Sequence, residues 1–176
     1  QFLNMPGIRL TLSYQKSPCG PSGQDDLEFL ISTNPGESLK PLSQVASGGE
    51  LSRIMLAIKT VLAGRDEIDT LIFDEIDTGI SGRTAWKVAE QLSVLSGAHQ
   101  VICITHLPQI AAMADVHFVI EKSSTDDMTI TDIHKVSAEE SLAELARLLG
   151  SDALTEAALS NAKEMKEQAG MFKETR

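Results

Sequence analysis

Two adjacent carboxylates, Asp74 and Glu75, follow a short apolar run at residues 71–73. A strand that ends in an Asp-Glu pair suits a Mg-nucleotide hydrolase, because one carboxylate can serve the metal while the next orients or deprotonates a water. We therefore expect Asp74 to hold Mg²⁺, directly or through a bound water, and Glu75 to act on the attacking water. The simpler alternative is a buried strand that ends in a solvated acidic turn.

A second motif lies upstream, where Ser47, Gly48, Gly49 and Glu50 precede residues with helical apolar spacing. Free backbone N–H groups at a helix N-terminus form an anion site, and glycine lets a phosphate approach the backbone closely. The same S-x-x-E pattern is also a capping box. Taken alone, the motif is compatible both with a helix N-terminus that binds a nucleotide and with an ordinary capped helix start.

A tight polar loop, with Asp77, Gly79, Ser81 and Gly82, separates the carboxylate pair from the next predicted helix. It can contribute to a phosphate site. A helix-start turn capped by Ser81 explains the same residues equally well.

His106 follows a second apolar run, residues 100–105. In a phosphate site its imidazole could contact the γ-phosphate or the attacking water; the plainer alternative is a polar strand end. Its neighbours have no His/Cys spacing of the zinc-binding kind, so we reject a zinc site.

The order of predicted elements indicates an α/β fold with a mainly parallel sheet flanked by helices and an antiparallel strand pair in front. Ser137 and Glu140 form a capping box, and Gly150 follows the end of that helix. The periodicity predicts these segments: strands 8–14 and 27–33 around a loop or hairpin tip at 17–26, helix 47–63, strand 70–73, helix 82–95, strand 100–105, helix 108–113, strands 116–121 and 128–136, and helices 137–149 and 155–168.

The composition excludes several classes of protein. With 176 residues the chain suits one domain, and its net charge of -10 argues against a general binder of nucleic-acid backbone. Cys19 and Cys103 lack metal spacing, Cys103 reads as a small core residue, and a reducing cytosol is the simplest compartment. The sequence shows neither a secretory signal nor a membrane span. Because it begins with Gln1, we expect a fragment or trimmed chain.

A phosphate-binding P-loop is missing from the sequence. Residues 79–84 echo one faintly, but the first glycine is misplaced and Arg83 stands where the motif requires Lys. The piece that would wrap the β-phosphate is therefore absent, and we expect the chain to be inactive alone.

Taken together and in this order, SGGE, LIFDEID, the loop after it and TH resemble the C-terminal half of an ABC-type ATPase head. Glu50, where transporters usually have Gln, is similar to the SMC-type branch of chromosome and repair proteins. Three longer strings of this sequence resemble one bacterial DNA repair family of that branch: STNPGESLKPLSQVASGGELSRIMLAIK, FDEIDTGISGRTA and THLPQIAAMAD. The similarity extends over about residues 5–165.

The resemblance implies a split head: an N-terminal lobe with the P-loop, a long coiled coil, and a C-terminal lobe that this chain represents. Residues 1–176 would then be one domain, with residues 1–5 as the stub of the coil and residues 170–176 as a frayed tail. It implies the following roles: Ser47, Gly48, Gly49 and Glu50 as the signature motif that contacts ATP held by an opposing head, Asp74 as the Mg-associated Walker B residue, Glu75 as the catalytic base, Asp77, Gly79, Ser81 and Gly82 as the D-loop, and His106 as the switch histidine.

The implied cofactors are ATP and Mg²⁺. The implied partners are the P-loop lobe of the same protein, a second head in a homodimer, and DNA through the full-length protein, without a membrane. ATP would pair two heads and hydrolysis would release them during recombinational repair of DNA double-strand breaks, in the cytoplasm and at the nucleoid. In dilute solution we expect the chain to be a monomer.

Two alternatives stay open at this point. One is a non-catalytic docking lobe, which would need neither the Asp74-Glu75 pair nor His106. The other is the head lobe of a different SMC-like recombination ATPase.

Overall fold

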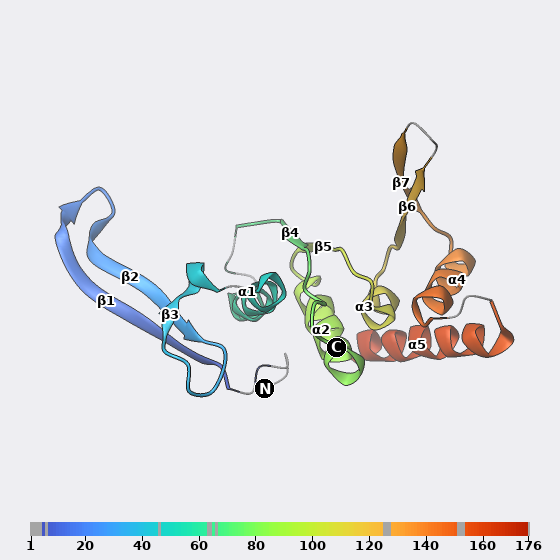
Figure 1. The fold of residues 1–176 in the computed structure, drawn as a ribbon, viewed down its shortest axis with the longest axis horizontal. Coiled ribbons are helices and arrows are strands. Elements are labelled where there is room, and N and C mark those ends of the chain that lie inside the picture. Colours follow the sequence, from blue (N-terminus) through green and yellow to red (C-terminus); the bar gives the residue numbers. More distant parts are fainter. Residues whose placement is uncertain are drawn as a thin grey trace.

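The computed structural model describes residues 5, 7–45, 47–62, 65, 67–124, 128–150 and 154–175. The β1–β2 hairpin and the α4–α5 pair lie at opposite ends of the molecule, with α1, α2 and α3 between them (Figure 1). The elements are, in chain order, β1 (Arg9–Gly20), β2 (Gly23–Ser32), β3 (Lys40–Pro41), the 3-10 turn η1 (Leu42–Gln44), α1 (Gly48–Leu62), β4 (Thr70–Phe73), α2 (Gly82–Leu95), β5 (Gln100–Cys103), α3 (Pro108–Met113), β6 (Phe118–Ser124), β7 (Thr129–Lys135), α4 (Ala138–Leu148) and α5 (Glu156–Glu174).

The predicted α/β class is confirmed, with a parallel pair and a leading antiparallel pair. Strands β4 and β5 run parallel, from Thr70 opposite Gln100 to Phe73 opposite Cys103. Within the described residues the strands form three separate small sheets, so the parallel sheet has only two strands. Strand β6 pairs antiparallel with β7 along its whole length, as is common for strands that are close together in the sequence.

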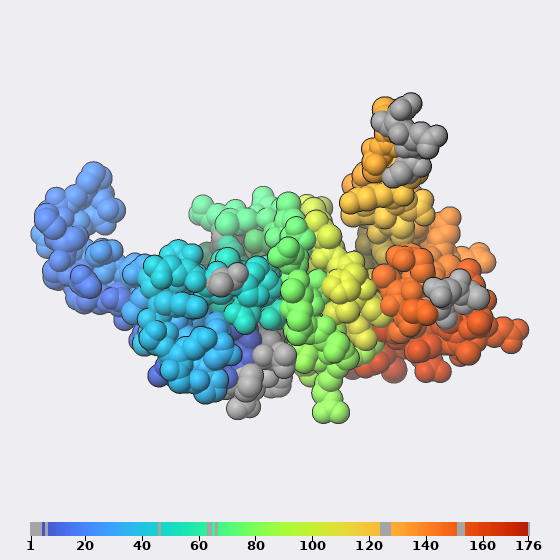
Figure 2. Space-filling view, in the orientation of Figure 1, coloured from blue at the N-terminus to red at the C-terminus, as the bar shows by residue number. Residues whose placement is uncertain are grey.

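Of the two alternatives predicted for the polar segment 17–26, the structure shows the hairpin tip, but the two strands extend further into the segment than predicted. Strand β1 continues to Gly20 and β2 resumes at Gly23, with a shift of register between Lys16 and Gly20. Lys16 and Asp25 lie opposite each other, with Lys16 Nζ 2.6 Å from Asp25 Oδ1, and this cross-strand charge pair favours the longer hairpin. The hairpin projects from the body of the molecule (Figure 2), with these large apolar side chains exposed: Leu10, Leu12, Tyr14, Leu27 and Phe29.

The C-terminal segment is helical where a frayed tail was predicted. Helix α5 continues to Glu174, beyond the predicted end at residue 168. Ala169 is buried in the main core and Phe172 packs against it, so burial keeps this part of the chain helical. At the other end, residues 1–4 of the expected coil stub lie outside the described residues, whereas Met5 packs with Ile31 and Ile54.

The main core lies between α2 and one face of the β4–β5 pair. Leu71 and Phe73 point into it, whereas Ile72 on the other face is 68% exposed and Ile102 is also exposed. A smaller cluster joins α3, α4 and α5 around Leu145. The parallel pair is thus covered on one side only. None of the helices in the described ranges combines the length and apolarity needed to cross a bilayer.

The predicted capping box at the start of α4 is confirmed and makes stability pH-dependent. The Glu140 N–H donates to Ser137 Oγ at 3.2 Å, and the Ser137 N–H donates to Glu140 Oε2 at 2.7 Å. The backbone hydrogen bond from Ser137 is the main cause that lowers the pKa of Glu140 below its ordinary 4.5. Its stabilising effect is therefore complete above about pH 4.5 and is lost as the pH falls through the lower folded value.

We expect Glu140→Gln to lower the free energy of unfolding at pH 7 and to differ less from the native chain in acid. Urea unfolding between pH 3 and pH 7 measures the difference. Glu139→Gln, next to it in the same first turn, is the matched control. A difference for Glu140→Gln that stays constant across this pH range would contradict the prediction.

Candidate functional site

The SGGE motif forms the N-terminus of α1. The Glu50 N–H donates to Ser47 Oγ at 3.4 Å, and the Leu51 N–H donates to the Ser47 carbonyl at 3.0 Å, so Ser47 caps the helix. Gly48 is exposed and Gly49 is buried. An exposed glycine at the positive end of a 15-residue helix is open to an anion from outside.

The carboxylate pair follows β4 at its C-terminal end. Both side chains are exposed, and Asp74 Oδ1 accepts a hydrogen bond from the Glu75 N–H at 2.9 Å. Glu75 has a φ of 58°, the only positive value at a non-glycine in the described residues. Such a left-handed backbone costs about 1–2 kcal/mol, so the surroundings must hold it in place.

The turn after β4 packs against the first turns of α1. The Glu75 carboxylate lies so close to Gly48 that a Cβ there would clash with Oε2. The backbone of Gly49 leaves no room for a side chain either, because a Cβ would lie 2.9 Å from the Glu75 carbonyl oxygen and 2.9 Å from Thr78 Cβ. The two predicted motifs therefore meet, and the glycines are what permits the approach.

Two polar side chains of α1, which sequence reasoning missed, hold this turn. Ser52 Oγ donates to the Asp74 carbonyl at 2.9 Å. Arg53 Nη1 donates to the carbonyls of Ile76 at 3.1 Å and Thr78 at 2.9 Å. Arg53 is 5% exposed, and burial lowers its pKa, an effect that the charge of Glu50 partly offsets.

Asp77 links this turn to His106. Its Oδ2 accepts hydrogen bonds from Thr105 Oγ1 at 2.6 Å and from the His106 N–H at 2.8 Å, and lies 3.0 Å from His106 Nδ1. The Asp77 side chain is 4% exposed and that of His106 72% exposed. An Nδ1–H that donates to Asp77 leaves the other ring nitrogen available to a ligand.

The remaining predicted loop residues are not part of this cluster. Gly79 and Gly82 have φ values of 75° and 51° and carry the chain into α2. Ser81 occupies the N-cap position, but its side chain makes no capping hydrogen bond.

Burial raises the pKa of Cys103 to about 12, which fits the predicted core thiol.

Asp74 is the candidate Mg²⁺ ligand, and its setting is compatible with that ion. One carboxylate oxygen is engaged by the Glu75 N–H. No group of three or more His, Cys, Asp or Glu side chains arranged to hold a metal occurs in the described part of the chain. Mg²⁺ commonly takes one or two carboxylates and completes its shell with waters and substrate phosphates. Asp74 therefore fits an ion that arrives with a nucleotide.

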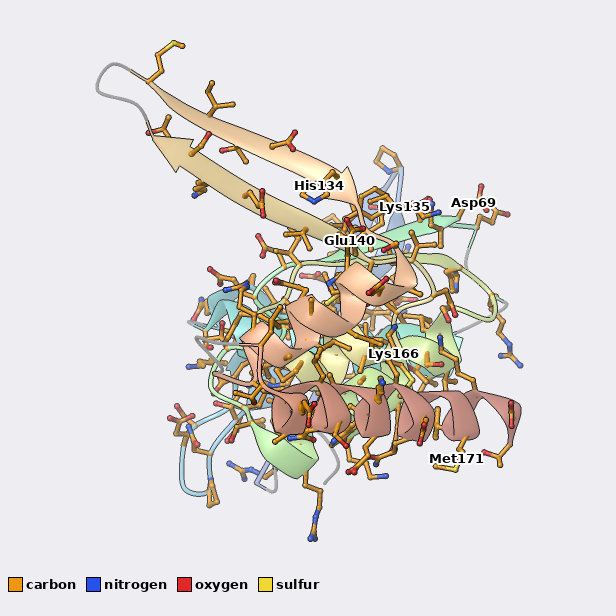
Figure 3. All side chains as sticks on the ribbon, turned by 90° about the vertical axis from the view of Figure 1, so that its right-hand side faces the viewer. Asp69, His134, Lys135, Glu140, Lys166 and Met171 are labelled. Carbon is orange, nitrogen blue, oxygen red and sulfur yellow. The ribbon has the colours of Figure 1, made fainter. Side chains whose placement is uncertain are left out.

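The candidate site is an open edge. A cavity of about 650 Å³ lies elsewhere, between the base of the β6–β7 hairpin, α4 and α5, where Lys135 and Lys166 line it (Figure 3). None of the residues that line it belongs to the candidate site. Another surface would thus have to close over the α1 N-terminus and Glu75.

The packing at Gly49 predicts a large effect for one methyl group. We expect Gly49→Ala to displace the Glu75 turn and to lower the free energy of unfolding by about 1–3 kcal/mol, because rigid backbone lies within 3 Å of the new Cβ. Gly170→Ala is the matched control, since Gly170 lies within α5 with open space around it. Alanine there should stabilise by about 0.5–1 kcal/mol. Equal urea midpoints for the two variants would refute the close packing at Gly49.

Comparison with known proteins identifies the family. No protein-family model matches the chain. It is 46% identical over 158 residues to the DNA repair protein RecN of Halalkalibacterium halodurans, which is 90% of this chain and 28% of that protein. It is 53% identical over 150 residues to RecN of Treponema pallidum, which is 85% of this chain and 26% of that protein. The chain thus spans about a quarter of the length of these relatives.

A solved structure supports the same assignment. The Smc head domain with a coiled coil and joint from Pyrococcus yayanosii has a TM-score of 0.55 and 26% sequence identity. The match covers 83% of this chain and 28% of that one. The fold is therefore that of part of an SMC-type ATPase head, and the chain belongs, as a segment, to the RecN family.

Proposed function

We propose that the chain supplies the signature and Walker B half of an ATP-hydrolysing, SMC-like head in recombinational repair of DNA double-strand breaks. The observation that carries this proposal is the contact between the α1 N-terminus and the Glu75 turn, together with the Asp77 link to His106. Similarity to RecN proteins supports the repair setting. A purely docking lobe would need none of these contacts.

The roles follow the chemistry of each group. Glu75 polarises a water for in-line attack on the γ-phosphate, and His106 contacts that phosphate or the water. Asp74 binds the Mg²⁺ that accompanies ATP, and this ion supplies charge neutralisation on the phosphates. The signature residues Ser47, Gly48, Gly49 and Glu50 contact ATP held by an opposing head, where the N–H groups of α1 stabilise negative charge. Asp77, Gly79, Ser81 and Gly82 form the D-loop.

The partners follow from what the chain lacks. The sequence has no P-loop, so the N-terminal lobe of the same protein must supply one. The exposed apolar face of β4–β5, with Ile72 and Ile102, supports such a covering lobe. A second head completes the ATP site. DNA engages the full-length protein, and the whole acts in the cytoplasm at the nucleoid.

The test is Mg-dependent ATPase activity of the chain with and without the separately made P-loop lobe. We expect activity only in the mixture, and none when the chain carries Glu75→Gln. Activity of the chain alone would refute the need for a P-loop lobe. A correctly associated mixture without activity would favour a docking lobe.

A further inference from the structure

Arg53 is a buried cation that the proposed chemistry does not use. It lies on the second turn of α1, is 5% exposed, and its Nε has no hydrogen-bond partner. Within the described ranges it forms no ion pair, and its Nη1 donates to the carbonyls of Ile76 and Thr78. Removing a charge from water is costly unless it is paired, so a cation kept in this position indicates a specific task.

Helix α1 binds the backbone of the turn that carries Glu75. Four carbonyls of the segment 74–78 face the helix. Ser52 Oγ binds that of Asp74, and Arg53 Nη1 binds those of Ile76 and Thr78. The carbonyl of Glu75 packs on Gly49. The backbone is thus fixed on both sides of Glu75, the residue with the unfavourable positive φ.

One nitrogen of Arg53 bridges two carbonyls that are two residues apart. Thr78 N–H also donates back to the Glu75 carbonyl at 3.0 Å, which closes the turn. Asp77 lies between the two bridged residues and binds Thr105 and His106. A shift of Arg53 would therefore move Glu75 and the Asp77–His106 contact together.

We propose that Arg53 is a positioning residue, which fixes the turn that carries Glu75 and Asp77 to the signature helix. The expected loss of ATP turnover rests on the proposed ATPase function, whereas the expected loosening of the turn does not. Nucleotide contact at the α1 N-terminus is thereby coupled to the place of the Glu75 carboxylate. Arg53 is 5% exposed and acts through the carbonyls that it binds. A lysine at this position places its donor nitrogen one bond nearer the backbone than Nη1 and should therefore hold the two carbonyls less well.

The first measurement is hydrogen–deuterium exchange in the full-length protein, with Arg53→Ala and Arg53→Lys. We expect at least tenfold faster exchange for amides 75–80 in Arg53→Ala, with a smaller rise in Arg53→Lys and no change in α2. Unchanged exchange at 75–80 would overturn the proposal whether or not the protein hydrolyses ATP. Arg147→Ala is the matched control, because Arg147 is exposed on α4 and pairs with Glu144.

The second measurement is steady-state ATP hydrolysis by the same proteins. We expect Arg53→Ala to lower kcat about 10- to 100-fold, as displaced catalytic groups do, with KM changed less than about threefold. Guanidinium at about 20 mM should restore part of kcat in Arg53→Ala and none in Glu75→Gln. A wild-type kcat in Arg53→Ala, or a change confined to KM, would overturn the proposal when Glu75→Gln is inactive in the same assay.

The two measurements separate the possible failures. If Arg53→Ala does not fold, Arg53→Lys decides the matter, since it retains the charge and most of the stem. If Glu75→Gln hydrolyses ATP normally while exchange at 75–80 still depends on Arg53, the proposed catalytic role of Glu75 fails and the positioning role of Arg53 stands.

Discussion

Replacing Glu75 with Gln should lower ATP turnover by the complete protein about 10²- to 10⁴-fold, the range that general-base catalysis contributes. Glutamine keeps the size of the side chain and its place beside Gly48, but it cannot accept a proton from the attacking water. In the proposed cycle, head pairing depends on ATP binding and not on hydrolysis, so it should persist in this variant. Phosphate release and ATP-dependent dimerisation, measured on one preparation, separate the two steps.

The matched control for this prediction is Glu164→Gln, an exposed residue of α5 far along the chain from the site. It removes the same charge and should leave turnover unchanged. Normal steady-state hydrolysis by Glu75→Gln would exclude Glu75 as the base. Loss of both turnover and dimerisation would mean that the carboxylate is needed for assembly as well.

The parts of the fold and of the site that could be predicted are those that depend on residues close together in the sequence. The pair Asp74-Glu75 follows an apolar strand, Ser47 precedes a helical pattern, and Ser137 stands three residues before Glu140. Each pattern depends on neighbours within a few residues, and the structure contains the expected strand end, helix start and capping box. Their catalytic and binding roles remain proposals.

The buried face of α1 could not be predicted in the same way. The apolar residues whose spacing predicts this helix are Leu51, Ile54, Met55, Ile58, Val61 and Leu62, and of these only Ile54 is fully buried. The helix also buries Gly49, Arg53 and Leu56. Val61 is 83% exposed. The carbonyls that Arg53 binds lie more than twenty residues downstream, and no hydrophobic period reports a cation that binds backbone oxygens.

The burial of Asp77 also depends on residues far from it in the sequence. The sequence places it in a polar loop, where a solvated side chain is the ordinary expectation. The structure buries it, because Thr105 and His106 at the end of the neighbouring strand β5 supply its donors. Parallel strands bring their C-terminal ends together, so an acid after one strand meets the polar end of the next.

The second large effect is therefore expected at Asp77. Substituting alanine should lower the free energy of unfolding of the chain by about 3–5 kcal/mol, since hydrogen bonds to a charged group are worth about 1.5–3 kcal/mol each and two donors lose their acceptor. Both donors, Thr105 Oγ1 and the His106 N–H, bind the same oxygen of Asp77, whose side chain is 4% exposed. Urea unfolding at pH 7 measures the change.

An internal control separates this effect from the loss of any Asp–His pair. Asp132 Oδ2 lies 3.4 Å from His134 Nδ1 on β7, where Asp132 is exposed and His134 is half-buried. Asp132→Ala should change the free energy of unfolding by less than about 1 kcal/mol, because water screens an exposed pair and replaces its contacts. Equal unfolding midpoints for Asp77→Ala and Asp132→Ala would show that Asp77 does not hold the two strand ends together. A much larger loss of stability for Asp77→Ala would show that the buried carboxylate with its two further donors, and not an Asp–His contact as such, holds the strand ends together.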